Sequence, residues 1–161
     1  MTINLYHKMD DYYSGNTPEV LINETIVKIG EILDKYYPEY IRFDNGAFAI
    51  IEGSTQVMIL VRPFTTEEAC IEFLANVVTG ATISNDLMRF LLRKNAELHF
   101  GSFGILFDDT VTFSHSISTA GFNEKELLTS LDSVAIIADY YDDIIVDLAG
   151  GKRAKDFAES L

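Results

Sequence analysis

The sequence predicts an α+β protein in which helices pack against an antiparallel sheet. Three segments repeat apolar residues at helical spacing, and five shorter apolar runs are separated by turn residues. Strands and helices do not alternate as a parallel sheet requires, and the expected order is α-β-β-β-α-β-β-α. At 161 residues the chain fits a single domain, with residues 1–16 as a loosely ordered arm and 152–161 as a frayed tail.

The first helix is expected to begin at Thr17-Pro18. Thr17 suits the capping position and Pro18 suits the first helical position. Apolar residues then recur at spacings of three and four as far as Tyr36, which is typical of one buried helical face. Tyr37-Pro38 ends the helix, because the residue before a proline avoids helical backbone angles.

Three strands are expected over residues 47–51, 56–61 and 69–78. Gly46 and Gly53 mark the turns before the first two strands, and Pro63 stops the second. The third run alternates apolar and mixed residues, which predicts one clearly apolar face. Strands joined by such short turns form an antiparallel meander.

The second and third helices have clear start signals. Ser84 is expected to cap the second helix, and Asn95 to end it in a left-handed conformation. Asn123 and Glu126 form a capping-box-like arrangement at the start of the third helix. Gly150-Gly151 is expected to end that helix.

A β-hairpin centred on Asp108-Asp109 is expected between these two helices. A two-residue loop would pair Leu106 with Val111 and Phe103 with Ser114. Asp-Asp is a weaker hairpin signal than Asn-Gly, so a four-residue loop remains an alternative.

Residues 87–151 resemble the YbjN-like family, which shares the fold of type III secretion chaperones. The resemblance rests on Leu91-Leu92 before Asn95, Phe103 four residues before Phe107, Asp108-Asp109, Ala138-Asp139, and Gly150-Gly151. It implies a small acidic protein that pairs with itself and holds an extended peptide of a partner against its sheet and helices. YbjN-like members are described as regulators of sensory or stress responses.

Composition argues against several classes of partner. The chain has 12 basic and 25 acidic residues, a net charge of −13, so nucleic acid and anionic membranes are not expected to bind. No apolar run approaches the roughly 18 residues of a membrane span, and no secretory signal is visible. Cys70 is the single cysteine and therefore indicates a reducing, cytoplasmic location.

No metal or cofactor site is predicted. In the two-residue hairpin register, His99 and His115 lie on opposite faces and cannot share a metal ion. The carboxylates of Asp139, Asp142 and Asp143 are interpreted as a solvated helix face rather than a metal or acid–base site.

No catalytic residue is predicted either. Residues 101–104, Gly-Ser-Phe-Gly, lack the strand–turn–helix setting of a nucleophile elbow and are not followed by a helix as a phosphate loop would be. Cys70 lies in an expected strand, where a buried, unreactive thiol is the default.

Adjacent tyrosines suggest an interaction surface, since a doublet on a helix cannot bury both rings on one narrow stripe. The predicted interaction residues are Phe103, Ile105, Phe107, Tyr140 and Tyr141. The competing interpretation places several of them in the core.

Three functions remain open at this stage. The favoured hypothesis is a non-catalytic adaptor that binds an unidentified protein or peptide and works as a homodimer. The alternative is a regulatory module of a sensory or stress-response pathway, which assembles with one folded partner. A small-ligand or metal-dependent enzyme is the third, and it would require a deep pocket lined by converging polar groups.

Overall fold

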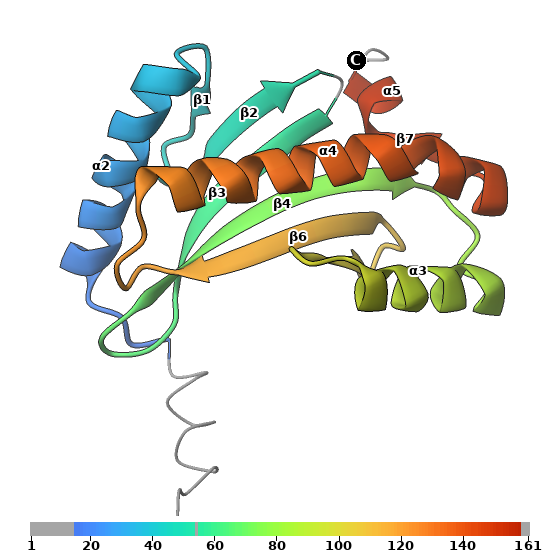
Figure 1. Cartoon of the computed structure of the whole chain (residues 1–161), viewed down its shortest axis with the longest axis horizontal. Helices are drawn as coiled ribbons and strands as arrows, with labels where there is room; N and C mark the ends of the chain where they lie inside the picture. The colour runs from blue at the N-terminus through green and yellow to red at the C-terminus, as the bar shows by residue number, and fades with distance from the viewer. Residues whose placement is uncertain (1–14, 54, 159–161) are drawn as a thin grey trace, which may run out of the picture.

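The computed structural model describes residues 15–53 and 55–158 and confirms the predicted α+β class (Figure 1). Within these residues, seven strands form one sheet, and the helices pack against it. In chain order the elements are α2 (Glu19–Tyr36), β1 (Ile41–Arg42), β2 (Phe48–Glu52), β3 (Thr55–Pro63), β4 (Ala69–Thr79), α3 (Asn85–Glu97), β5 (Ser102–Ile105), β6 (Val111–Ser118), α4 (Glu124–Ala149), β7 (Lys152–Arg153) and α5 (Ala154–Ala158).

The sheet is antiparallel and is built around β4. The strand order is β1-β2-β3-β4-β6-β5, and β7 pairs with the end of β4. β4 is the longest strand, with 11 residues, and has β3 on one side and β6 on the other. The two-residue strands β1 and β7 are additional to the five strands that the sequence predicts.

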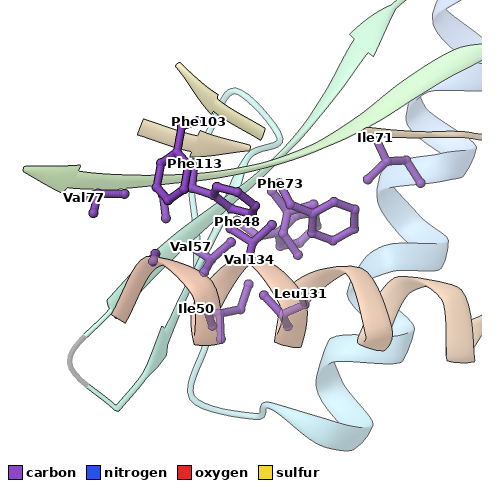
Figure 2. Packing of buried hydrophobic residues seen from close by; sticks show 14 of the residues in the cluster. Phe48, Ile50, Val57, Ile71, Phe73, Val77, Phe103, Phe113, Leu131 and Val134 are labelled. Carbon is purple, nitrogen blue, oxygen red and sulfur yellow. The ribbon is translucent and has the colours of Figure 1, made fainter. Parts of the chain in front are cut away.

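The hydrophobic core lies between one face of the sheet and the helices α2 and α4. Phe48, Phe73 and Phe113 are completely buried there and come from β2, β4 and β6. Figure 2 shows these rings packed near Leu131 and Val134 of α4. Burial of such a cluster is the main stabilising contribution to the fold.

The start of α2 differs from the prediction. Pro18 occupies the capping position without a side-chain cap. The Thr17 hydroxyl, which was expected to cap, donates instead to the carbonyl of Thr65 at 2.6 Å. It also accepts from the backbone N–H of Phe64 at 2.7 Å, so Thr17 ties the start of α2 to the turn between β3 and β4.

The prediction of a two-residue loop in the hairpin is wrong, and so is the alternative of a four-residue loop. The Leu106 N–H donates to the Thr110 carbonyl at 3.0 Å, so residues 107–109 form a three-residue turn. Asp109 lies in the left-handed region of this turn, with a φ of 63°. Phe103 therefore pairs with Phe113 instead of Ser114. A shift of one residue exchanges the two faces of a strand, so Phe103 turns toward the helices.

The ends of the chain also differ from expectation. The sequence predicts a frayed tail from residue 152, but residues 152–153 form β7 and residues 154–158 form α5. Residues 159–161 and residues 1–14 of the predicted arm lie outside the described residues.

Candidate functional site

Among the residues that the structure describes, no helix covers one face of the sheet. Most odd-numbered residues of β3 and β4 face the helices, and Val57, Ile59 and Phe73 among them are completely buried. Even-numbered residues of the two strands point to the opposite side, because successive side chains alternate across a strand. We call this side the open sheet face; on β3 and β4 it consists of Gln56, Met58, Leu60, Arg62, Cys70, Glu72, Leu74 and Asn76.

The open sheet face has an apolar centre and a polar rim. Met58 and Leu74 are direct cross-strand partners, and both side chains are partly exposed. Leu60 lies opposite Glu72, whose carboxylate accepts a hydrogen bond from the Arg62 guanidinium. Surfaces with a desolvated centre and a hydrated border are typical of protein interfaces.

Two hollows lie at opposite ends of this face. The larger, of about 700 Å³, includes Met58, Leu74 and Asn76 in its lining. The smaller, of about 410 Å³, includes Arg62, Cys70 and Glu72. Cys70 and Asn76 are six positions apart on β4, which is about 20 Å along a strand. The two hollows and the face between them could accommodate an extended chain of about six residues.

Cys70 contributes a weakly reactive thiol to this face. The side chain is partly exposed, and burial raises its pKa above the usual 9.0. A raised pKa keeps the sulfur protonated near neutral pH, and a protonated thiol is a poor nucleophile. The prediction of an unreactive Cys70 agrees with this pKa, although the side chain is less buried than expected.

The predicted interaction residues lie where β5, the following turn and α4 come together. Phe103 is buried (6% exposed), and its ring packs edge-on against Phe113 and Tyr141 at centroid distances of 4.9 and 5.3 Å. Tyr140 is 66% exposed and Phe107, in the turn, is fully exposed. Phe103 is therefore part of the core, as the competing interpretation states, while Tyr140, Phe107 and the partly exposed Ile105 remain available.

Asn95 protects the outer edge of β5. Its side-chain amide accepts from Phe103 N–H at 2.6 Å and donates to Phe103 C=O at 3.1 Å. These two bonds imitate a neighbouring strand at an edge that would otherwise present free backbone groups. The predicted role of Asn95 as a helix terminator is wrong, because α3 continues to Glu97.

The histidines do not form a metal site in the part of the chain that the structure describes. The argument that His99 and His115 lie on opposite faces of the hairpin fails. The hairpin register differs by one residue from the predicted one, and His99 precedes β5. His115 contacts the Phe100 ring at a centroid distance of 5.8 Å, and burial lowers its pKa. Across residues 15–53 and 55–158, no three His, Cys, Asp or Glu side chains gather as metal ligands would.

The acidic group on α4 is not simply solvated. Asp142 is only 5% exposed and its carboxylate lies 3.2 Å from Lys155 Nζ. Asp143 pairs with Arg153 at 3.0 Å. The sequence offered no signal for these pairs, because they depend on how the chain turns after α4.

The open sheet face was not among the predicted site residues. The signal was present in residues 69–78, where Cys70, Glu72, Leu74 and Asn76 alternate with the apolar set. A mixed second face of this kind predicts partial exposure, but it does not show that the face lacks a covering helix.

The fold and this face define a small α+β protein with an exposed sheet surface. Among the described residues, no helix has the length and apolar character needed to cross a membrane. The chain belongs to the family described as T3SS (YopN, CesT) and YbjN peptide-binding chaperone 1, which matches residues 28–156. This match confirms the resemblance seen in the sequence and extends it into the amino-terminal half.

Two solved structures have a similar fold. One is the ExsC–ExsE complex, with a TM-score of 0.61, 16% identity, and coverage of 78% of this chain and 96% of that chain. Another is the HopA1–SchA chaperone–effector complex, with a TM-score of 0.55, 9% identity, and coverage of 74% and 97%. No curated protein is similar enough in sequence to count as a relative.

Proposed function

We propose that this chain is a non-catalytic, chaperone-like adaptor that binds an extended segment of a partner polypeptide along its open sheet face. The observation that carries the proposal is the pair of hollows at the two ends of β3 and β4, the larger lined in part by Met58 and Leu74, with Leu60 between the two hollows. Apolar side chains of the partner would fill this centre, and its polar groups would meet the rim.

The family and the similar structures support a polypeptide ligand. The family description names peptide-binding chaperones, and one similar structure is described as a chaperone–effector complex. The net charge of −13 favours a partner segment that is neutral or basic, because like charges repel across an interface.

We also propose that the protein works as a homodimer in the cytoplasm. Apolar side chains that remain exposed on α3, the hairpin and α4 would form the pairing surface: Met88, Leu92, Ile105, Phe107 and Tyr140. Two strongly acidic chains repel each other, so such a pair needs apolar contact to form. The single cysteine fits a reducing location.

A photo-cross-linking experiment tests the polypeptide site. Met58 is replaced by p-benzoylphenylalanine in the organism's own cells, and the matched control carries the same residue at Ile136, which is 65% exposed on α4. The expected result is one polypeptide cross-linked through a short extended segment at position 58 but not at position 136. Adding Leu74→Asp should abolish the product, because a charge would be placed in the apolar centre.

The outcomes separate the open alternatives. A cross-linked partner that is folded throughout would favour the regulatory module, and equal labelling at both positions would refute the sheet site. The homodimer is tested by sedimentation equilibrium of the unaltered chain, Leu92→Glu and the control Ile136→Glu. We expect only Leu92→Glu to be monomeric, and a monomeric unaltered chain would contradict the pairing proposal.

A further inference from the structure

The chain reverses sharply after α4 and returns along the sheet. Gly150 and Gly151 both have positive φ angles, of 71° and 85°. A Cβ atom on Gly151 would lie 2.5 Å from Thr79 O and 2.7 Å from Ala81 N, so only glycine fits this approach. The reversal lets β7 pair with Val78 and Thr79 of β4. We call residues 151–158 the C-terminal segment.

Basic side chains hold the C-terminal segment on the acidic face of α4. Arg153 lies 3.0 Å from Asp143, and Lys155 lies 3.2 Å from Asp142 and 3.8 Å from Asp139. The Asp142 side chain is only 7% exposed, so the chain's own Lys155 supplies a cation to a nearly buried carboxylate. A buried carboxylate needs such a partner to remain charged.

The same segment forms one wall of the larger hollow. Arg153 and Lys155 line it together with Met58 and Leu74 of the open sheet face and Ala138 of α4. Because this hollow is lined both by the open sheet face and by Ala138 and Asp142 of α4, it joins the two sides of the sheet at the end where β3 begins. The C-terminal segment therefore occupies the end of the proposed polypeptide groove that is next to the α4 carboxylates.

The attachment of the segment is weak compared with the rest of the fold. β7 contributes only two residue pairs to the sheet, and the side chains of Arg153 and its partners Asp143 and Asp156 are 33%, 70% and 36% exposed, so that only the pair of Lys155 with Asp142 is largely buried. Exposed ion pairs contribute little stability, and segments with few buried contacts open at low free energy. The segment could therefore leave while the core under α4 stays intact.

We propose that the C-terminal segment is a releasable internal occupant of this end of the groove, and that a basic segment of the bound polypeptide displaces it. Arginine or lysine side chains of the partner take the places of Arg153 and Lys155 at the α4 carboxylates. The inference rests on the proposed function, since the displacing ligand is the polypeptide that the groove binds.

Hydrogen exchange of the full chain tests release without any partner. In Arg153→Ala/Lys155→Ala, amide protection of residues 152–156 should fall about fivefold to tenfold, the effect of losing the four ion pairs that these two side chains make. Arg89→Ala/Arg93→Ala, which removes two exposed charges from α3, is the matched control and should leave that protection unchanged. Unchanged exchange in the first variant would overturn the inference.

Displacement is tested with a labelled synthetic peptide of residues 151–158, Gly-Lys-Arg-Ala-Lys-Asp-Phe-Ala, by fluorescence anisotropy. The Arg153→Ala/Lys155→Ala chain should bind it at least about fivefold more tightly than the unaltered chain, whose own segment competes. A peptide in which the residues corresponding to Arg153 and Lys155 are alanine should not bind. The Arg153→Ala/Lys155→Ala chain should also lose the binding when Asp142→Asn and Asp143→Asn are added to it. Equal binding to both chains would overturn displacement. The photo-cross-link at Met58 is a separate measurement, so failure of the groove and failure of the segment give different results.

Discussion

The two hydrogen bonds from Asn95 to the backbone of Phe103 make a quantitative prediction about the edge of the sheet. In Asn95→Ala, the N–H and C=O of Phe103 both lose their partner on the outer side of β5. Each bond contributes about 1 kcal/mol, and a partly buried N–H left unsatisfied adds a further penalty. We expect the free energy of unfolding to fall by about 2–3 kcal/mol.

Urea denaturation followed by circular dichroism measures this loss, and hydrogen exchange locates it. At about 1.4 kcal/mol for each factor of ten, a local loss of 2 kcal/mol should speed exchange of the Phe103 amide roughly thirtyfold. Asn95→Asp keeps an acceptor for the N–H but has no donor for the C=O, so its loss should be about half as large.

A matched control is Asn76→Ala, which removes an exposed amide from the open sheet face. Its effect should stay below about 0.5 kcal/mol. An Asn95→Ala variant as stable as this control would refute the reasoning, because the side chain would then contribute nothing at the β5 edge.

Three further variants test other contacts. Thr17→Val should lower the free energy of unfolding by about 2 kcal/mol in urea, since the hydroxyl's bonds to the Thr65 carbonyl and from the Phe64 N–H are both lost. Gly101→Ala should cost roughly 3 kcal/mol, because φ is +79° and the new Cβ would lie 2.7 Å from the Phe113 ring. Burial lowers the pKa of His115 below 6.5, so the unfolded state binds the proton more strongly and stability should fall as pH drops through 6.5. His115→Phe should reduce that slope in denaturation at pH 5.5 and 7.5.

Each of these three has an informative control. Thr17→Ser retains the hydroxyl and should recover most of the lost stability. Gly53→Ala has a positive φ of 59° but no neighbour within 4 Å, so it should lose only about 1 kcal/mol. Equal losses at Gly53 and Gly101 would show that crowding against Phe113 is unimportant. An unchanged slope in His115→Phe would mean that other groups carry the pH dependence.

Elements with a strong pattern could be predicted from the sequence, and elements held by tertiary contacts could not. The three long helices and the strands β2 to β6 have apolar periods that local sequence reveals. β1 and β7 have two residues each, too few to show any alternation. Their positions follow from pairing with β2 and β4.

The hairpin register shows how one local signal controls a site prediction. Asp108-Asp109 does not specify a two-residue turn, and the chain uses three residues with Asp109 at positive φ. The extra residue moves Phe103 from the predicted surface into the core. The open sheet face could not be predicted for a different reason, since alternation within a strand does not show which face the helices cover.

The three-residue turn also has a practical consequence for spectroscopy. It leaves the Phe107 ring fully exposed at its tip, in a chain that contains no tryptophan. Phe107→Trp would therefore introduce a single indole without disturbing the core. In the dilute protein without a partner, its fluorescence emission would be that of a fully hydrated indole. A blue shift on concentrating the protein would report contact at the hairpin, and a shift on adding a partner would report binding there.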